Sequence, residues 1–225
     1  YSSDYRPKRA ETIASRHHSG GGKMCFPIQL DNTRVDTFQE KFNKVLALLN
    51  GRKLDILVNN AGVLGCHISN GTEEEEYDQV LDTNLKGTFF LSQIVGHYFK
   101  DNHINGNILN IASSSSLRPA ASAYTLSKWG IRGLTIGLAK TFAPFGVTVN
   151  GLAPGQTLTP MLVKDSDDNN VYNESVPLKR YVLPCEIANM AVILVSDMGR
   201  SIMGDIVYMT GGAGVFSNED MNYSF

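Results

Sequence analysis

The stretch LDILVNNAG, residues 54–62, decides the fold of this chain. Its first five residues form a short, mostly apolar run with the length of a buried strand. The run passes directly into Asn59-Asn60-Ala61-Gly62, a small polar segment of the kind that ends a strand. In an open parallel sheet, ligands bind beyond the carboxyl ends of the strands. The stretch therefore predicts a strand followed by one side of a ligand site.

The same alternation of apolar runs and amphipathic stretches extends in both directions. The apolar runs predict strands at residues 23–30, 54–58, 106–111, 147–152 and 206–209. The amphipathic stretches predict helices at 7–16, 35–49 and 122–141, and two more that begin near Thr72 and Pro184. Thr72 and Glu75 have the form of a capping box, and proline is favoured at a first helical position. This pattern predicts an α/β protein with a doubly wound parallel sheet, in a single domain that covers residues 1–225.

Composition and charge exclude several function classes. The chain has 225 residues, of which 42% are hydrophobic and 19% charged, as in ordinary globular proteins. With 20 Lys and Arg against 22 Asp and Glu, charge alone predicts no binding to nucleic acid or to an anionic membrane. No apolar run is long enough to span a bilayer. Three scattered cysteines suit a reduced cytoplasm, and none stands at a metal-ligand spacing, so we expect a cytoplasmic protein without a metal site.

A tyrosine and a lysine are spaced for acid–base chemistry. Tyr124 and Lys128 are four residues apart in a predicted helix, which puts them on the same face, one turn apart. A phenol with a pKa near 10 is a poor acid or base at neutral pH. A neighbouring ammonium group stabilises the phenolate and lowers that pKa, so the tyrosine could exchange a proton with an alcohol or carbonyl oxygen. Composition alone predicts about 0.4 such pairs in this chain, so the pair needs support from other residues.

That support comes from the order in which other motifs follow one another. Asn59-Asn60-Ala61-Gly62 after one strand, Asn84 in Asn-Leu-Lys-Gly, Ser113 after the next strand, the Tyr124/Lys128 pair and Pro154-Gly155 occur in this sequence. Taken together, the chain resembles the short-chain dehydrogenase/reductases over nearly its whole length. The resemblance implies a Rossmann fold that binds NAD or NADP. It also implies an oxidoreductase that interconverts a secondary alcohol and a ketone as its small-molecule substrates.

The resemblance assigns catalytic roles to four residues of this chain. Tyr124 would be the general acid/base, and Lys128 would lower its pKa and hold the nicotinamide ribose. Ser113 would hydrogen-bond the substrate oxygen, and Asn84 would anchor a water in a proton relay through Lys128. Three more serines follow Ser113, and its interval to Tyr124 is short for the family. Ser114 is therefore a rival to Ser113, which we favour.

The resemblance also assigns residues to the cofactor. Asn59, Ala61 and Gly62 would line the adenosine-ribose side, and Asp31 would lie at the adenine. The nicotinamide end would be held, besides Tyr124 and Lys128, by Pro154, Gly155, Thr157 and Thr159. If Asp4 reads the adenosine ribose, NAD is favoured, because a carboxylate repels a 2′-phosphate. Arg6 with Ser2 or Ser3 would favour NADP instead, and we give NAD a slight preference.

One family motif has no counterpart here. The family opens with a strand and Thr-Gly-x-x-x-Gly-x-Gly, whose backbone N–H groups meet the cofactor's pyrophosphate. No stretch of this sequence matches it. We therefore expect the sequence to be truncated at its N-terminus, with the first strand, glycine loop and first helix upstream of Tyr1. The chain as it stands would then be inactive.

Two readings of function stay open. The first is an NAD(P)-dependent dehydrogenase or reductase whose substrate resembles a 3-oxoacyl-acyl-carrier-protein, a sugar alcohol or a hydroxysteroid. The second is a non-catalytic binding or regulatory relative that lacks the phosphate loop. The residues that remain, Tyr124, Lys128, Asn84 and Ser113, favour the enzyme. By resemblance to the family, the helix at 122–141 and the helix before it would pair two copies, which predicts a homodimer or homotetramer.

Overall fold

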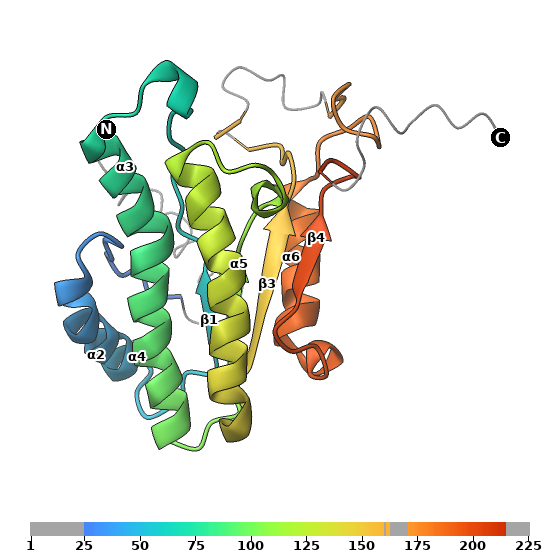
Figure 1. Cartoon of the computed structure of the whole chain (residues 1–225). Helices are drawn as coiled ribbons and strands as arrows, with labels where there is room; N and C mark the ends of the chain where they lie inside the picture. The colour runs from blue at the N-terminus through green and yellow to red at the C-terminus, as the bar shows by residue number, and fades with distance from the viewer. Residues whose placement is uncertain (1–24, 160, 163–170, 215–225) are drawn as a thin grey trace.

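The chain folds around a parallel sheet of four strands. The computed structural model describes residues 25–159, 161–162 and 171–214. The strands are β1 (Ile56–Asn59), β2 (Asn107–Ile111), β3 (Thr148–Pro154) and β4 (Ile206–Met209), hydrogen-bonded in the order β1-β2-β3-β4 and all parallel (Figure 1). Four of the predicted strands are thereby confirmed, with ends that differ by at most two residues.

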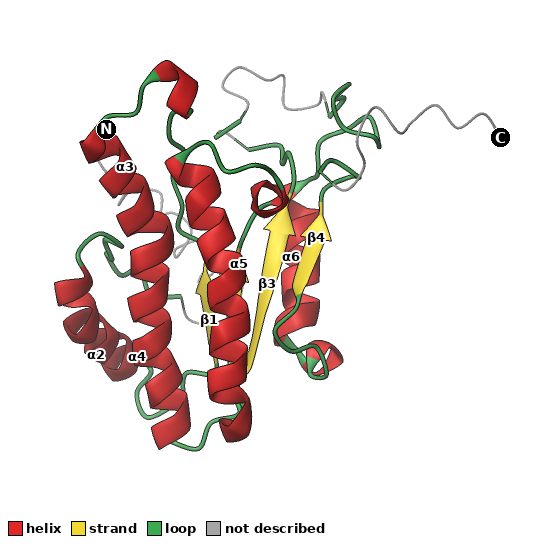
Figure 2. Cartoon of the chain, in the orientation of Figure 1, coloured by secondary structure: helices red, strands yellow, loops and turns green. Residues whose placement is uncertain are grey.

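Helices cover the sheet on both faces. They are α2 (Phe38–Leu48), α3 (Glu74–Leu81), α4 (Gly87–Asp101), α5 (Ala123–Phe142) and α6 (Pro184–Val195). The helices α4 and α5 lie side by side on one face, α6 lies on the other, and α2 flanks α4 (Figure 2). The predicted α/β class with a doubly wound parallel sheet is confirmed.

The core lies between the sheet and these helices. Strands β2 and β3 are buried on both faces, as expected for the middle of a parallel sheet. On the α4 and α5 face, the main cluster of buried residues comprises Phe42, Val95, Phe99, Ile104, Ile108, Ala139, Phe142, Val147 and Val149. On the opposite face, Leu109 and Leu152 pack against Leu194 of α6. Because both faces of the strands at 107–111 and 148–154 are buried, these strands could be predicted from short apolar runs in the sequence.

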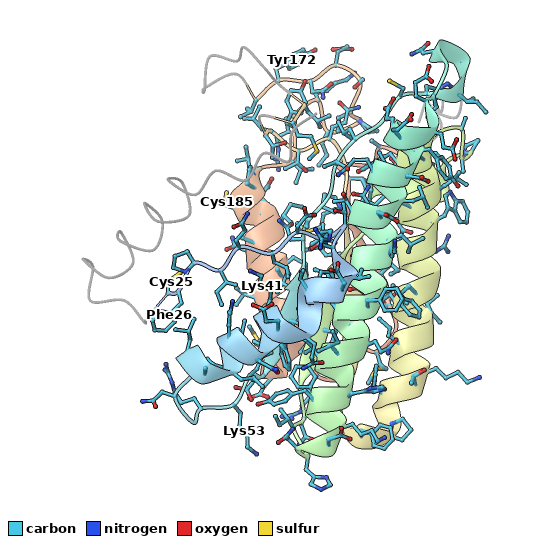
Figure 3. All side chains as sticks on the ribbon, turned by 90° about the vertical axis from the view of Figure 1, so that its left-hand side faces the viewer. Cys25, Phe26, Lys41, Lys53, Tyr172 and Cys185 are labelled. Atoms are coloured by element: carbon cyan, nitrogen blue, oxygen red, sulfur yellow. The ribbon has the colours of Figure 1, made fainter. Side chains whose placement is uncertain are left out.

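The strand predicted at 23–30 is wrong for the residues that the structure describes. Residues 25–30 form no strand and run beside α2 instead, where Pro27 and Ile28 lie near Lys41 (Figure 3 labels Cys25, Phe26 and Lys41). A strand needs a neighbour to receive its backbone hydrogen bonds, and Pro27 itself has no N–H to donate. An apolar run alone is therefore insufficient. The helix predicted at 7–16 lies outside the described residues.

The start of α3 also differs from the prediction. The N-cap is Glu73 and not Thr72, because Glu73 has the extended backbone of a cap and the helix begins at Glu74. The capping box of Thr72 and Glu75 is therefore absent. The acidic side chains do occupy the first turn, where the helix dipole favours them. A π-helical turn, Asp82–Lys86, then joins α3 to α4.

The start of α6 follows the prediction. Pro184 occupies the first turn, and the Glu186 carboxylate accepts a hydrogen bond from the Leu183 backbone N–H at 2.8 Å. Arg180 makes a bidentate pair with the same carboxylate, at 2.8 and 2.9 Å. Arg180 and this backbone N–H together lower the pKa of Glu186 to about 2. The segment before α6 is thus tied to the helix. Within the described ranges, no helix combines the length and apolar character that a membrane crossing requires.

Candidate active site

The candidate site lies at the carboxyl ends of the strands. The loop after β1 carries Gly62, the segment after β2 begins with Ser113, and β3 ends at Pro154. The first turn of α5 meets this edge, where a bridge pairs His67 with Ser122. Ser122 is the N-cap of α5, and its hydroxyl accepts a hydrogen bond from the Thr125 N–H at 3.1 Å. This cap sets the start of the helix and hence the position of its tyrosine.

The Ser113 side chain lies close enough to the Tyr124 hydroxyl to act on its pKa, which it lowers. The Ser113 hydroxyl also accepts a hydrogen bond from the Ser115 N–H at 3.1 Å. Ser114 is buried and has its β-carbon near Gly214, where an added methyl group would lie 3.7 Å from it. Ser113 thus acts on Tyr124, and its catalytic role in preference to Ser114 stays a prediction.

Lys128 lies one turn along α5 and is buried, with 5% of its surface exposed. Its Nζ donates a hydrogen bond to the Ile111 carbonyl oxygen at 2.8 Å and lies 5.7 Å from the centre of the Tyr124 ring. Because burial disfavours the ammonium form, the pKa of Lys128 falls to about 8. Ile111 was not singled out as a partner by the sequence, since a backbone carbonyl leaves no residue-type signal.

The pKa of Tyr124 differs from the prediction. Burial raises the pKa of Tyr124, and the hydrogen bond from Ser113 acts in the opposite direction. The net direction is therefore upward in the folded chain. The lowering by Lys128 that we expected stays a prediction, with its Nζ 5.7 Å from the ring centre.

Asn84 joins the loop after β1 to α5. It lies in the π-helical turn, almost fully buried, and its Oδ1 accepts a hydrogen bond from the Val63 N–H at 2.8 Å. Its Nδ2 donates to the Val63 carbonyl and to the Ser127 hydroxyl, each at 3.0 Å. Ser127 in turn donates to the Tyr124 carbonyl at 2.7 Å. The sequence interpretation missed Ser127, although it lies inside the Tyr124–Lys128 motif. The relay water expected at Asn84 stays a prediction.

Lys128 keeps donors that the described residues do not use. A β-carbon on Gly62 would lie 3.7 Å from the Lys128 Nζ and 3.5 Å from the Asn84 Oδ1, in ordinary van der Waals contact, so Gly62 lies next to both groups. An ammonium group has three hydrogen-bond donors, and among the described residues only the Ile111 carbonyl accepts from it. The predicted role of Tyr124 and Lys128 at the nicotinamide ribose would use the other two donors. The place of Gly62 on the adenosine-ribose side stays a prediction.

The residues expected on the adenosine side are placed differently. Asn59 is buried, and its side chain donates to the Ser92 hydroxyl at 2.9 Å and to the Asn110 Oδ1 at 2.8 Å. Its side-chain amide therefore ties β1 to β2 and α4. The place that we predicted for Asn59 on the adenosine-ribose side stays a prediction. Ala61 is exposed.

The two aspartates expected at the cofactor have different outcomes. Asp31 is exposed, and its carboxylate accepts hydrogen bonds from the Thr33 N–H and hydroxyl at 2.9 and 2.8 Å, in a turn before α2. A place at the adenine stays a prediction for it. Asp4 lies outside the described residues. The preference for NAD, which depends on Asp4, therefore stays a prediction.

The residues expected at the nicotinamide end lie together after β3. Gly155 donates from its N–H to the Met209 carbonyl at 2.9 Å, and a β-carbon there would lie 2.7 Å from the Thr210 Cα. Only glycine fits this close approach of two chain segments. Thr157 donates to the Gly155 carbonyl at 3.1 Å, and Thr159 to the Thr157 carbonyl at 3.4 Å. The segment from Pro154 is thus a compact turn at the same edge as Tyr124. Among the described residues, no group of three or more His, Cys, Asp or Glu could hold a metal ion.

Comparisons with known proteins agree on one family. A family model described as enoyl-(acyl carrier protein) reductase matches residues 2–214. The 3-oxoacyl-acyl-carrier-protein reductase of Staphylococcus epidermidis is 34% identical over 194 residues, 85% of this chain and 78% of that protein. The corresponding reductase of Aquifex aeolicus is 30% identical over 209 residues, 91% of this chain and 83% of that protein.

Solved structures show the same likeness. A putative gluconate dehydrogenase from Agrobacterium tumefaciens superposes with a TM-score of 0.83 at 28% identity, covering 94% of this chain and 84% of that one. A short-chain dehydrogenase from Burkholderia cenocepacia in complex with NADP gives 0.79 at 27% identity, with 94% and 84% covered. A 4-hydroxyisoleucine dehydrogenase complexed with NADH gives 0.74 at 28% identity, with 84% and 81% covered.

Proposed function

The chain belongs to the short-chain dehydrogenase/reductase family, and from this premise we propose that it interconverts a secondary alcohol and a ketone with Tyr124 as the general acid/base. The observation that carries the proposal is the approach of the Ser113 side chain to the Tyr124 hydroxyl, beside the buried ammonium of Lys128. These are three groups with the chemistry that the reaction needs, at one edge of one sheet. The cofactor is NAD or NADP, as in family members of known structure.

The roles of the side chains follow from their chemistry. The bound cofactor supplies or accepts the hydride. In ketone reduction, the hydroxyls of Ser113 and Tyr124 donate hydrogen bonds to the carbonyl oxygen, and Tyr124 then transfers its proton to that oxygen. Because burial raises the pKa of Tyr124, its hydroxyl is protonated at neutral pH and ready for this transfer. Lys128 holds the ribose hydroxyls, and its charge stabilises the phenolate that is left.

We propose a 3-oxoacyl thioester as the first substrate class to test. Its support is the similarity to two 3-oxoacyl-acyl-carrier-protein reductases over most of their length. A sugar acid or sugar alcohol is the second candidate, favoured by the similarity to a gluconate dehydrogenase structure. A hydroxysteroid completes the panel of substrates.

The test is the oxidation of NADH and NADPH by the full-length gene product, followed at 340 nm with a 3-oxoacyl thioester, a keto-sugar acid and a ketosteroid. Replacing Tyr124 by Phe is expected to lower kcat by about 10²- to 10⁴-fold, the usual contribution of a general acid. The matched control is Tyr98→Phe, which removes a hydroxyl that accepts only from the Leu54 N–H at 3.4 Å, in the α4 packing. Turnover that is absent for every substrate, or equal in the parent and Tyr124→Phe, would favour a binding or regulatory relative instead.

We also propose that the protein is a homo-oligomer of the cytoplasm. Large apolar side chains are exposed on the outer surface of α4 and α5, namely Phe89, Phe90, Trp129, Ile136 and Phe145 just after α5. A patch of this kind on neighbouring helices is typical of a protein–protein interface. The cytoplasmic assignment rests on the cysteines, since Cys25, Cys66 and Cys185 are all free thiols.

A further inference from the structure

The serine run after β2 contains more than one functional hydroxyl. Ser113 is the N-cap of a 3₁₀ turn, Ser114–Leu117, in which its own hydroxyl accepts from the Ser115 N–H. Ser116 is completely buried, and its hydroxyl donates to the Ser113 carbonyl oxygen at 2.8 Å. The backbone and the side chain of Ser113 are therefore each held by a different serine of the same turn.

This 3₁₀ turn is held by a residue of strand β4, which is distant in the sequence. The Tyr208 hydroxyl, at the carboxyl end of β4, lies 3.1 Å from the Ser116 Oγ, 92 positions away in the sequence. Ser116 has one hydroxyl proton, and a carbonyl oxygen can only accept, so this proton goes to Ser113. The Tyr208 hydroxyl must therefore be the donor to Ser116. The hydrogen bonds run in one direction, from Tyr208 to Ser116 to the Ser113 carbonyl.

We propose that Tyr208 and Ser116 are positioning residues, which hold the Ser113 hydroxyl against Tyr124. This inference rests on the proposed function, because it concerns the same reaction. The Tyr208 ring packs beside the buried Ile131 and Ala153, so its hydroxyl is carried by a rigid wall of the core. A role in apolar packing alone would need only the ring of Tyr208 and not a hydroxyl that reaches the serine turn.

Few charged groups lie near this chain of hydrogen bonds. On α5, Lys128 approaches the Tyr124 ring, and the Arg132 guanidinium lies 3.5 Å from the Ser116 carbonyl oxygen. From the β2 side, the contacts of Tyr124 and Ser113 that the structure describes are with uncharged hydroxyl and backbone groups. A change at Tyr208 therefore removes one hydroxyl and alters no charge. Any change in the titration of Tyr124 then reports on the position of Ser113.

The test uses Tyr208→Phe and Ser116→Ala in the full chain, with Tyr98→Phe as the control that removes a remote tyrosine hydroxyl. The ionisation of Tyr124 is measured as tyrosinate absorbance at 295 nm, as the difference between each protein and the same protein with Tyr124→Phe. The Ser113 hydrogen bond lowers the pKa of Tyr124, so we expect that pKa to rise in Tyr208→Phe and Ser116→Ala and to stay unchanged in Tyr98→Phe. This measurement needs no turnover.

Kinetics provide the second measurement. We expect kcat to fall about three- to tenfold in Tyr208→Phe, as for one lost neutral hydrogen bond, while KM for the cofactor is retained. In alcohol oxidation, the acid limb of the pH–rate profile should move to higher pH, because Tyr124 must be deprotonated to act as a base. Loss of packing alone would not move this limb. Tyr208→Phe keeps the ring, so it tests the proposal even if Ser116→Ala does not fold.

The outcomes separate this proposal from the proposed function. A shifted Tyr124 titration in a chain that turns over no substrate would support the positioning role and count against the enzyme. Turnover with an unshifted titration and an unshifted acid limb in both variants would overturn the positioning role and leave the enzyme standing. A fall in kcat without either shift would mean that Tyr208 is only structural, which also overturns the proposal.

Discussion

Lys128 shows how one buried residue couples function to stability. It is buried without a carboxylate partner among the described residues, so its ammonium form is costly in the folded chain. Its pKa falls from 10.5 to about 8, which means that the folded state binds fewer protons than the unfolded state between these values. Unfolding therefore becomes less favourable as the pH rises through this window. Below pH 8 the penalty is fully present.

We predict that Lys128→Met stabilises the fold at pH 7 and that this advantage shrinks by about 2 kcal/mol between pH 7 and pH 10. The substitution also leaves the Ile111 carbonyl without its donor, but that cost does not depend on pH. Urea unfolding at the two pH values measures the difference. Lys140→Met, at an exposed position of the same helix, is the control and should show no such change with pH. An advantage that is constant with pH would contradict the argument.

The raised pKa of Tyr124 acts in the opposite sense and in a different window. A folded pKa above 10 contributes stability that is present below pH 10 and is lost as the pH rises further. The two residues of the Tyr-x-x-x-Lys motif thus have separate pH ranges. This separation is why pH 7 to 10 isolates the lysine.

At the scale of elements, α4 and α5 pack closely together because α4 carries a glycine at their contact. Gly96 of α4 faces the Phe142 ring at the end of α5, and a β-carbon there would lie 2.3 Å from the ring's Cζ. Phe142 is buried in the main cluster on this face and is surrounded by other core side chains. The ring cannot move away without disturbing the packing that positions α5 and its first turn.

We predict that Gly96→Ala destabilises the fold by about 1–3 kcal/mol, the usual range for overpacking a core. Helix propensity alone would favour alanine by about 1 kcal/mol, so the sign of the effect tests the contact. Chemical unfolding of Gly96→Ala, Phe142→Leu and the double variant measures it. A smaller side chain at 142 should relieve the clash. The double variant should therefore lose less free energy of unfolding than the two single variants lose together. Strict additivity would mean that the two residues do not compete for space.

At the scale of the whole molecule, the outer surface of α4 and α5 is the part that the fold leaves uncovered. Ile136 is 51% exposed on α5, and Phe89 and Phe90 are exposed on α4, close to each other with ring centres 5.2 Å apart. None of these three side chains is among the buried core residues that the structure describes. In the proposed homo-oligomer, α4 and α5 of a second copy would cover these side chains.

We predict that Ile136→Glu converts the proposed homo-oligomer to smaller species, because burying a carboxylate in an apolar contact is costly. Sedimentation velocity of the parent and the variant measures this. Met198→Glu, an exposed position in the turn after α6, is the control and should leave the assembly unchanged. A parent that sediments as a monomer would be evidence against the interface.

Local features of the fold could be read from the sequence because they depend on neighbours in the chain. The order of the four strands, the helix at 123–142 and the proline at the start of α6 follow from periodicity and capping over a few residues. Tyr124 and Lys128 share a helix face for the same reason. The strand predicted at 23–30 failed because pairing depends on a neighbouring strand, which an apolar run does not specify.

What the sequence determined by itself was the class of the fold and the family to which the chain belongs. The tertiary structure alone decided that the Asn59 amide turns into the core, that burial raises the pKa of Tyr124 and lowers the pKa of Lys128, and that Tyr208 reaches Ser116. The physical reason is that spacing in the chain sets which groups share a helix face or a strand end. Burial, dielectric environment and hydrogen bonds across 51 or 92 positions arise only when separate elements pack together.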